Sequence, residues 1–339
     1  MRYLLGDYTT EGGPGLVAAG PGGLGRAAAA ADPSWIVTGG PGGVVYSVAE
    51  TDQGTAEAWR VGEDFTPVPV GQARPVGGAA PCHAAIHPSG RWLLVANYGS
   101  GSVAVLPIGS DGALGEATDV HQLVGSGPDP ERQEGPHAHQ VVFRDGRVLV
   151  VDLGSDAIHA FDLDGGGRLQ PVAATALEPG FGPRHLVFLG KRAFVVGELA
   201  NAVQVATFDP GSAQFDLGPV LALPGTDQAD LAALPDIGLP EGVPRPQPAA
   251  IVADPDHNLI YVTIRGTDQL AVIDPSGPAL LRSVPVGGSW PRDAVLTADG
   301  TVLVACQFSG TVTRVDPTGR AAAETVWDCP GVSRVAPLA

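Results

Sequence analysis

A proline-led segment recurs along the chain, and this repeat limits the possible folds more than any other feature of the sequence. Each copy has a proline, a short apolar strand, a turn, and a second apolar strand that ends on a polar residue about 15 to 17 positions after the proline. The copies begin at Pro33, Pro81, Pro136, Pro183, Pro248 and Pro291, and their second strands end at Glu50, Asn97, Asp152, Glu198, Arg265 and Gln307. Tandem units of roughly 40–50 residues with three or four strands each are typical of β-propellers.

The two ends of the chain complete a seventh unit. Residues 3–8 look like the second strand of a repeat that lacks its first strand, and residues 332–335 follow a Pro-Gly turn at the other end. A propeller closes its ring when one blade takes strands from both ends of the chain. We therefore predict an all-β, seven-bladed β-propeller whose last blade combines N- and C-terminal strands, with residues 1–339 forming a single domain.

The composition agrees with many short strands. The 48 glycines and 32 prolines disfavour long helices and favour tight turns, while 44% apolar residues are enough for a packed core. Residues 210–246 contain closely spaced prolines, so we expect the outer strand of one blade followed by a long irregular connection. The sequence leaves open whether this connection is a lid over a site or a surface loop.

The charge of the chain argues against nucleic acids and anionic membranes as partners. The formal net charge is −17, and Lys191 is the only lysine among 19 basic residues. Arginines inside a cleft still bind anions, because local geometry outweighs net charge. We expect a small anionic molecule as the partner of a monomer or a small homo-oligomer.

No segment of the sequence resembles a targeting or membrane-spanning segment. The N-terminus has no long apolar run, and no stretch approaches 18 apolar residues. Cys82, Cys306 and Cys329 are too scattered for a metal site and are expected to be free, buried thiols. These features predict a cytoplasmic protein without a metal or a cofactor.

The polar residues at the strand ends are candidates for a site near the central channel of the propeller. Asn97 and Asp152 also fit a local role, because Asn and Asp side chains bond the backbone of turns. Glu198 and Arg265 fit that role poorly. His137 and His139, two apart at the start of a strand, are candidates for acid/base chemistry because imidazole titrates near neutrality. A strand-capping surface pair and a zinc site are the alternatives for these two histidines.

Residues just after the prolines form a second set of candidates. Arg184 and Arg292 follow Pro183 and Pro291 at equivalent places in two repeats. A guanidinium there binds a ligand carboxylate or phosphate, or it joins blades by bonding main-chain carbonyls. The full set of candidate substrate-binding residues is Arg132, Gln133, His83, Asn97, Asp152, His185, Arg292 and Gln307.

Three segments carry a resemblance to a known family. They are residues 132–139 (RQEGPHAH), 152–156 (DLGSD) and 179–188 (PGFGPRHLVF), and Glu198, Arg265 and Arg292 continue the pattern in the same order. Nearly the whole chain resembles the lactonase family of seven-bladed propellers, which includes propeller-type 6-phosphogluconolactonases and fungal-type 3-carboxy-cis,cis-muconate lactonizing enzymes. The chain departs from the family at residues 263–265, where Thr-Ile-Arg replaces a frequent Asn-Arg ending.

The resemblance implies a catalytic site built from a histidine of the Pro-His-Ala-His run with Arg184, Glu198 and Arg265. It does not decide between His137 and His139, although His139 is slightly favoured. Opening a lactone needs a base for water and a donor for the developing oxyanion. A histidine or Glu198 would be the base, and an arginine would be the donor.

The activity implied by the resemblance is hydrolysis of an anionic sugar lactone in carbohydrate metabolism, as in a 6-phosphogluconolactonase. A phosphosugar requires several cationic groups close together, and Arg132, Arg184, Arg265 and Arg292 are at hand. The same residue types also suit a muconate-type lactonizing cycloisomerase. A non-catalytic propeller that binds a partner is the third alternative, because propellers host many functions.

Overall fold

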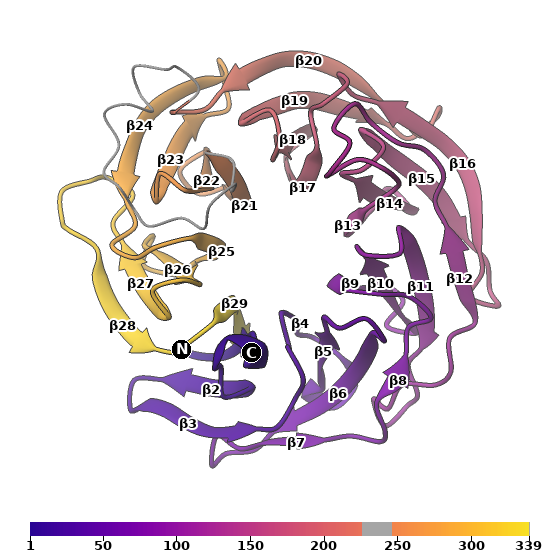
Figure 1. The fold of residues 1–339 in the computed structure, drawn as a ribbon, viewed down its shortest axis with the longest axis vertical. Helices are drawn as coiled ribbons and strands as arrows, with labels where there is room; N and C mark the ends of the chain where they lie inside the picture. The colour runs from indigo at the N-terminus through magenta and orange to yellow at the C-terminus, as the bar shows by residue number, and fades with distance from the viewer. Residues whose placement is uncertain (226–245, 339) are drawn as a thin grey trace.

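The computed structural model describes residues 1–225 and 246–338, and this part of the chain forms seven antiparallel sheets arranged in a ring (Figure 1). The first three sheets along the chain contain β4 (Trp35–Val37), β5 (Val45–Ala49), β6 (Thr55–Val61), β7 (Pro67–Pro69) and β8 (Arg74–Pro75); β9 (Pro81–Ile86), β10 (Trp92–Asn97), β11 (Ser102–Pro107) and β12 (Asp119–Gln122); and β13 (Ala138–Arg144), β14 (Arg147–Asp152), β15 (Ala157–Leu163) and β16 (Leu169–Ala176).

Three further sheets complete the run of internal repeats. They contain β17 (Pro183–Leu189), β18 (Arg192–Gly197), β19 (Ala202–Asp209) and β20 (Gln214–Ala222); β21 (Gln247–Asp254), β22 (Leu259–Arg265), β23 (Gln269–Asp274) and β24 (Ala279–Pro285); and β25 (Pro291–Leu296), β26 (Val302–Cys306), β27 (Thr311–Val315) and β28 (Glu324–Asp328). Two short 3₁₀ turns, η1 (Thr9–Glu11) and η2 (Pro41–Gly43), lie between strands.

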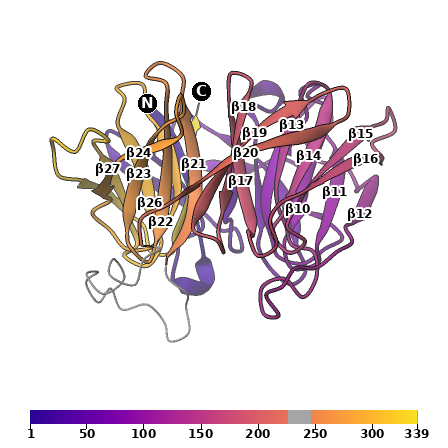
Figure 2. The same cartoon turned by 90° about the horizontal axis from the view of Figure 1, so that it is seen from above.

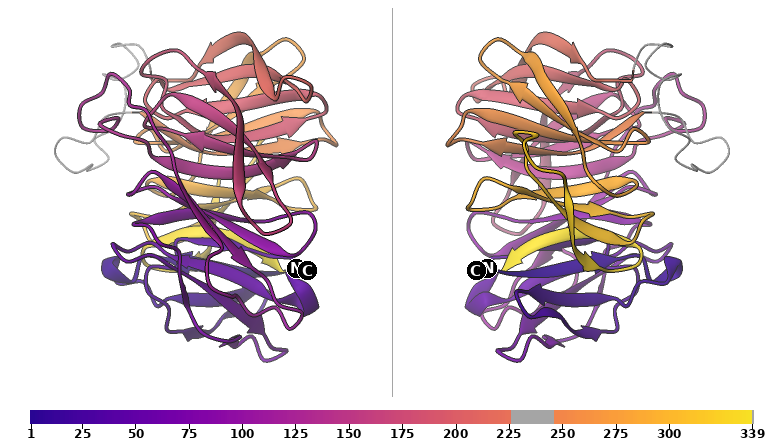
Figure 3. Two further views of the ribbon diagram at one scale, coloured as in Figure 1. Left: turned by 90° about the vertical axis from the view of Figure 1, so that its right-hand side faces the viewer. Right: turned by 90° about the vertical axis from the view of Figure 1, so that its left-hand side faces the viewer.

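The seventh sheet joins the two ends of the chain, as predicted. Its order is β29 (Val332–Leu338), β1 (Arg2–Asp7), β2 (Leu16–Gly20) and β3 (Gly23–Ala28), and Leu4 of β1 pairs with Ala336 of β29. The labelled chain ends consequently lie together in Figures 1 and 3. The prediction of an all-β, seven-bladed propeller closed by both termini is confirmed.

The first strand of each repeat lies nearest the central axis (Figure 1). These inner strands, β4, β9, β13, β17, β21, β25 and β29, contact one another around the whole ring. In the side view of Figure 2, strands run between the two faces of the molecule. We call the face at which the second strand of each repeat ends the upper face, although it is at the bottom of Figure 2, and the face with the labelled chain ends the lower face.

The core lies between neighbouring sheets. Strand β10 is buried at every position, because its alternate side chains face the sheets on either side of its own. Leu93 and Val95 pack toward the β4–β8 sheet, whereas Leu94 and Ala96 pack toward the β13–β16 sheet. This double burial explains why the second strands read as continuous apolar runs in the sequence.

The expected starts of the inner strands and ends of the second strands agree with the structure to within two residues. The exception is the C-terminal strand, which was expected over residues 332–335 and extends to Leu338. For the segment 210–246, the predicted outer strand is β20, and the predicted irregular connection, including the question of a lid, lies outside the described residues. Within residues 1–225 and 246–338, no helix is long and apolar enough to span a membrane.

Candidate active site

Glu198 is the centre of the charged residues at the upper face. It follows β18 directly, and its side chain is 3% exposed. Its Oε1 lies 2.6 Å from Nη2 of Arg132, and its Oε2 lies 3.0 Å from Nε of Arg184 and 2.7 Å from Nη2 of Arg265. We call these four residues the arginine cluster. The structure thus brings together the three predicted catalytic residues Arg184, Glu198 and Arg265 with the predicted substrate-binding residue Arg132, and their roles stay predictions.

Each arginine of this cluster is positioned by a different element. Arg184, on the inner strand β17, also donates from Nη1 to the carbonyl oxygen of Ala249 at 2.9 Å. Arg265 ends β22, donates from Nε to the carbonyl of Gln247 at 3.2 Å, and places its guanidinium 5.1 Å from the ring centre of Trp290. These contacts hold both guanidinium groups against the sheet that contains β21 and β22.

Arg132 comes from the loop between β12 and β13, and that loop is fixed by its own hydrogen bonds. The backbone N–H of Arg132 donates to Oδ1 of Asp129 at 3.1 Å, and Gln133 donates from Nε2 to the carbonyl of Leu153 at 2.9 Å. The side chain of Gln133 is buried by this contact. Gln133 thus has a structural task, and its predicted contact with substrate stays a prediction.

The cluster keeps Glu198 ionised. Burial opposes its charge, but Arg265, Arg132 and Arg184 outweigh that effect and hold the pKa of the carboxyl far below its usual range. Burial lowers the pKa of Arg265 to about 10, which leaves it charged at neutral pH. Both of its oxygens are occupied by guanidinium groups, so this carboxylate is poorly placed to act as a general base. Glu198 is better suited to holding the three guanidinium groups in place.

Arg292 forms a second charged group near the axis. Its Nη2 lies 3.6 Å from Oε2 of Glu50, its guanidinium lies 5.1 Å from the ring centre of Tyr8, and the Tyr8 hydroxyl donates to Oε2 of Glu50 at 2.7 Å. The charge of Glu198 also acts on Arg292. Tyr8 was not among the residues expected at the site.

His137 is held by oxygen atoms on both sides of its ring. Its Nδ1 donates to the carbonyl of Tyr98 at 2.9 Å, its Nε2 lies 3.2 Å from Oε1 of Glu134, and its ring stacks on that of Tyr98 at 4.5 Å. Both ring nitrogens therefore already face an oxygen atom of the protein.

His139 has different surroundings. Its Nδ1 lies 3.7 Å from Sγ of Cys82, and its ring meets that of His185 edge-on at 5.1 Å. Burial, reinforced by the charge of Arg184, holds the pKa of His139 well below its usual value. The imidazole is therefore neutral at physiological pH and able to accept a proton.

His83 and His185 continue the ring contacts toward β4. Their rings lie 5.5 Å apart, and His83 packs on Trp35 at 4.3 Å. Burial is the main cause that lowers the pKa of both histidines well below the usual value. Nε2 of His185 is buried and has no hydrogen-bond partner among the described residues. Within the described residues, no group of three His, Cys, Asp or Glu side chains is placed to hold a metal ion.

The strand-end candidates occupy two successive positions of the repeat. The backbone N–H groups of Glu50, Tyr98, Glu198 and Gln307 each donate to the carbonyl of the residue directly before the proline of the repeat, and that of Tyr8 donates to Gly331, directly before β29. These five residues are therefore equivalent. Asn97 and Asp152 lie one position earlier, paired with Pro81 and Ala138 of the inner strands. The distance from the proline to the strand-end residue varies between repeats, so the sequence alone does not show that Asn97 and Asp152 are one position earlier than the others.

The two residues at the earlier position hold the local backbone and turns in place. Asn97 donates to the hydroxyl of Ser102 at 3.1 Å, and Asp152 accepts the backbone N–H groups of His137 at 2.6 Å and Gly154 at 3.0 Å. Both side chains are fully buried. Gln307, at the later position, donates to Oε1 of Glu11 at 2.8 Å. The predicted substrate contacts of these three residues stay predictions.

Tyr8 and Tyr98 are the site residues that the sequence analysis missed. The Tyr98 hydroxyl accepts a hydrogen bond from Nη2 of Arg132 at 3.4 Å, and its ring contacts both His137 and His139. A sequence pattern could have identified both tyrosines. In the pairs Asp7-Tyr8 and Asn97-Tyr98, a tyrosine directly follows the buried polar residue that ends a second strand.

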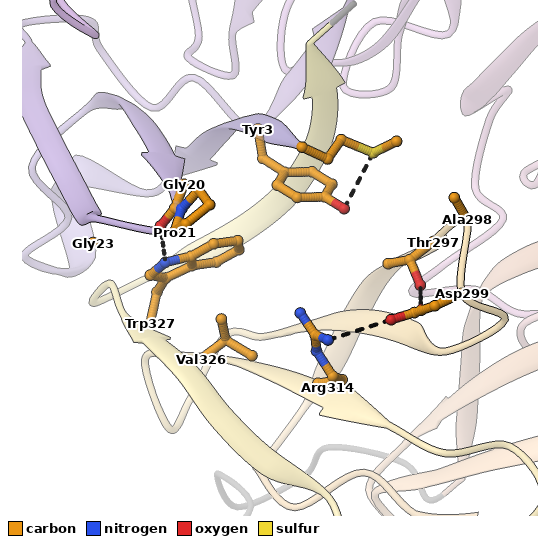
Figure 4. Close-up of a pocket in the computed structure, with 11 residues that line it drawn as sticks. Tyr3, Gly20, Pro21, Gly23, Thr297, Ala298, Asp299, Arg314, Val326 and Trp327 are labelled. Carbon is orange, nitrogen blue, oxygen red and sulfur yellow. Dashed lines mark hydrogen bonds and ion pairs between the residues drawn. The ribbon is translucent and has the colours of Figure 1, made fainter.

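A pocket of about 480 Å³ lies away from these residues, between the closing sheet and the β25–β28 sheet (Figure 4). Figure 4 shows Tyr3 and Trp327 on one side of it and the ion pair of Arg314 with Asp299 on the other. Second strands begin, and inner strands end, at the lower face. Tyr3 is near the start of the second strand β1, and Asp299 lies in the turn after the inner strand β25, so the pocket opens toward the lower face. None of the predicted site residues lines it.

Comparison with known proteins agrees with the fold and the residue pattern. A family model described as lactonase, 7-bladed β-propeller, matches residues 22–325. This chain belongs to the lactonase family. A 6-phosphogluconolactonase of Bacillus subtilis (strain 168) is 31% identical over 288 residues, which cover 82% of this chain and 78% of that protein. A 6-phosphogluconolactonase of Formosa agariphila is 27% identical over 289 residues, covering 80% and 77%.

Solved structures show the same lactonase-family architecture. A protein from Lactobacillus plantarum is 28% identical with a TM-score of 0.83, covering 99% of this chain and 98% of that one. The periplasmic gluconolactonase of Pseudomonas aeruginosa has a TM-score of 0.84 over 100% of both chains, and its 24% identity supports the shared fold alone. The family resemblance inferred from residues 132–139, 152–156 and 179–188 is confirmed.

Proposed function

We propose that this member of the lactonase family is a lactone hydrolase of the 6-phosphogluconolactonase type, which opens an anionic sugar lactone. The names of its relatives support this activity. The structural observation that carries the proposal is an excess of positive charge at the upper face. Four guanidinium groups, those of Arg132, Arg184, Arg265 and Arg292, share two carboxylates, those of Glu50 and Glu198. The exposed carboxylate of Glu134 also acts on Arg132, which still leaves one guanidinium charge for an anionic substrate to balance.

The four arginines form two pairs that differ in how far their side chains are exposed to solvent. The side chains of Arg132 and Arg292 are 29% and 18% exposed, whereas those of Arg184 and Arg265 are 4% and 6% exposed. The first two are accessible to the phosphate or carboxylate of a ligand, and charge-assisted hydrogen bonds make such contacts strong. The deeper two are better placed to stabilise negative charge that develops on the lactone carbonyl oxygen, where burial strengthens the electrostatic attraction.

His139 is the proposed base. Its neutral imidazole takes a proton from water as the water oxygen bonds to the carbonyl carbon, and the negative charge moves to the carbonyl oxygen near the arginines. When the intermediate collapses, the bond from carbon to the ring oxygen breaks. The imidazolium returns its proton to that oxygen, which gives the open hydroxy acid. Glu198 contributes by fixing the arginines and takes no proton.

The test is hydrolysis of freshly prepared 6-phosphogluconolactone beside unphosphorylated gluconolactone, with spontaneous ring opening subtracted from every trace. We expect turnover that favours the phosphorylated substrate and a kcat/KM at least about 100-fold lower in Glu198→Gln, because the arginines lose their common anchor. The matched control is Glu116→Gln, which changes an exposed ion pair with Arg74 and leaves kcat/KM unchanged.

No rate above background on either lactone would remove this proposal. Carboxymuconate lactones would then be tested, because turnover of those compounds identifies a lactonizing cycloisomerase. A cytoplasmic location is part of the proposal and is supported by the three cysteines, which are all free and buried. Cell fractionation checks it.

A further inference from the structure

Cys82 lies against His139 in the narrow space between two inner strands. Its strand β9 contacts β13, which carries His139. The sulfur lies 3.7 Å from Nδ1 of His139, 3.7 Å from the carbonyl oxygen of Ala138 and 3.6 Å from the carbonyl oxygen of His139 itself. The side chain is buried, so these neighbours fix how its single hydrogen is used.

The single thiol hydrogen has two possible acceptors, Nδ1 of His139 or a carbonyl oxygen. Burial raises the pKa of the Cys82 thiol far above its usual value, so the thiol keeps its hydrogen at physiological pH. Donation to Nδ1 would leave sulfur lone pairs facing both carbonyl oxygens, which only accept, so donation to the carbonyl of Ala138 or His139 is the better arrangement. A sulfur lone pair is then left for Nδ1–H of His139. A neutral imidazole has one N–H group, so Nε2 carries the free lone pair.

We propose that Cys82 is a positioning residue that holds neutral His139 in the tautomer with Nδ1 protonated and thereby presents Nε2 as the base. This inference rests on the proposed function, in which His139 is that base. His137 is less suited to this role, because both of its ring nitrogens already face oxygen atoms of Tyr98 and Glu134.

The other groups around His139 leave this arrangement in place. The titratable and charged side chains that act on its ring are Cys82, Tyr98, Arg184, His185, Glu198 and Arg292. His185 meets the ring edge-on and orients it. Burial first, and then Arg184 and Arg292, lower the pKa of His139 and outweigh Glu198, which raises it, so the imidazole stays neutral between turnovers.

The test combines two substitutions with a direct measurement of the tautomer. Cys82→Val keeps a similar shape but removes both the donor and the acceptor, and Cys82→Ser restores them with a hydroxyl. We expect kcat of Cys82→Val to fall roughly 10-fold or more, with KM changed less than about 3-fold, because general base catalysis contributes about 10²–10⁴. Cys82→Ser should recover most of that loss. Cys306→Val removes another buried thiol and should leave kcat unchanged.

Nitrogen-15 NMR of histidine-labelled protein reports the protonated nitrogen without any activity assay. Subtracting the spectrum of His139→Asn from that of the wild type assigns the signals of His139. We expect Nδ1 to be protonated in wild type and a population protonated at Nε2 to grow in Cys82→Val. Wild-type His139 protonated at Nε2, or wild-type kcat in Cys82→Val, would overturn the inference. Because the wild-type spectrum needs neither turnover nor a variant at Cys82, failure of the proposed lactonase activity is distinguishable from failure of the tautomer assignment.

Discussion

Glu198 is a buried carboxylate whose two oxygens meet guanidinium groups from a loop and two strands. Taking an ion out of water costs several kcal/mol, and pairing offsets that cost only when the geometry is good. The pairing here is close at both oxygens, so the carboxylate is held in its ionised form. Removing its charge leaves three arginines near one another with no common counter-ion.

Glu198→Gln is therefore expected to lower the free energy of unfolding by about 3–5 kcal/mol at pH 7. The folded-state pKa of Glu198 lies below the unfolded value of 4.5, so its ionised form stabilises the fold above about pH 4.5, and this contribution is lost as pH falls further. Urea denaturation of both proteins at pH 7 and pH 3.5 measures the effect. The difference between them should shrink at the lower pH, and an unchanged difference would contradict the assignment.

The strand β1 shows how a single element ties the ring together. Its alternate residues point to different neighbours, since Leu4 packs with Ile36 and Trp59 on one side and Leu5 packs with Leu303 and Trp327 on the other. Both leucines are fully buried. The strand also pairs with β29 from the far end of the chain, so its packing connects the first and last repeats.

Leu5→Ala should lower the free energy of unfolding by about 2–5 kcal/mol, because it leaves a cavity between the closing sheet and the β25–β28 sheet. Leu217→Ala is the matched control, since Leu217 lies on the outer strand β20 and is 44% exposed. We expect a change within roughly 0.5 kcal/mol there. Equal losses for the two variants, measured by urea denaturation, would argue against the closure contributing to stability.

At the scale of the whole molecule, closure distinguishes this ring from an open array of repeats. In open arrays each unit contacts only its neighbours, and the two ends are free to unfold separately. Here every inner strand contacts an inner strand on both sides, including β29 with β4. This continuous contact within the described residues is a reason to expect one cooperative unit, and a single domain over residues 1–339 stays a prediction.

A single domain should unfold in one cooperative transition. The tryptophans report on several sheets, because Trp59 lies on β6, Trp92 on β10 and Trp327 on β28. Tryptophan fluorescence and far-ultraviolet circular dichroism should give coincident urea transitions. Separate midpoints would show that some blades unfold independently and would contradict the single-domain prediction.

The sequence by itself determined the number of repeats, the positions of the inner and second strands, and the closure by both termini. This was possible because the signals are local: prolines and glycines mark the turns, and apolar runs mark strands that are covered on both faces. It also indicated that Glu198 and Arg265 differ from Asn97 and Asp152, since the propensity of a residue for turns is a local property.

Only the tertiary structure decided which of the candidate side chains meet. Register shifts between the inner and second strands occur at this end of six of the seven sheets in the described part of the chain, so the position of a strand-end side chain depends on a pairing that a repeat alignment does not show. The approach of Arg132, Arg184 and Arg265 to one carboxylate depends on the curvature of the ring. Burial and charge then make Glu198 an anchor and His139 a neutral imidazole, because both pKa values depend on groups that are distant in the chain and close in space.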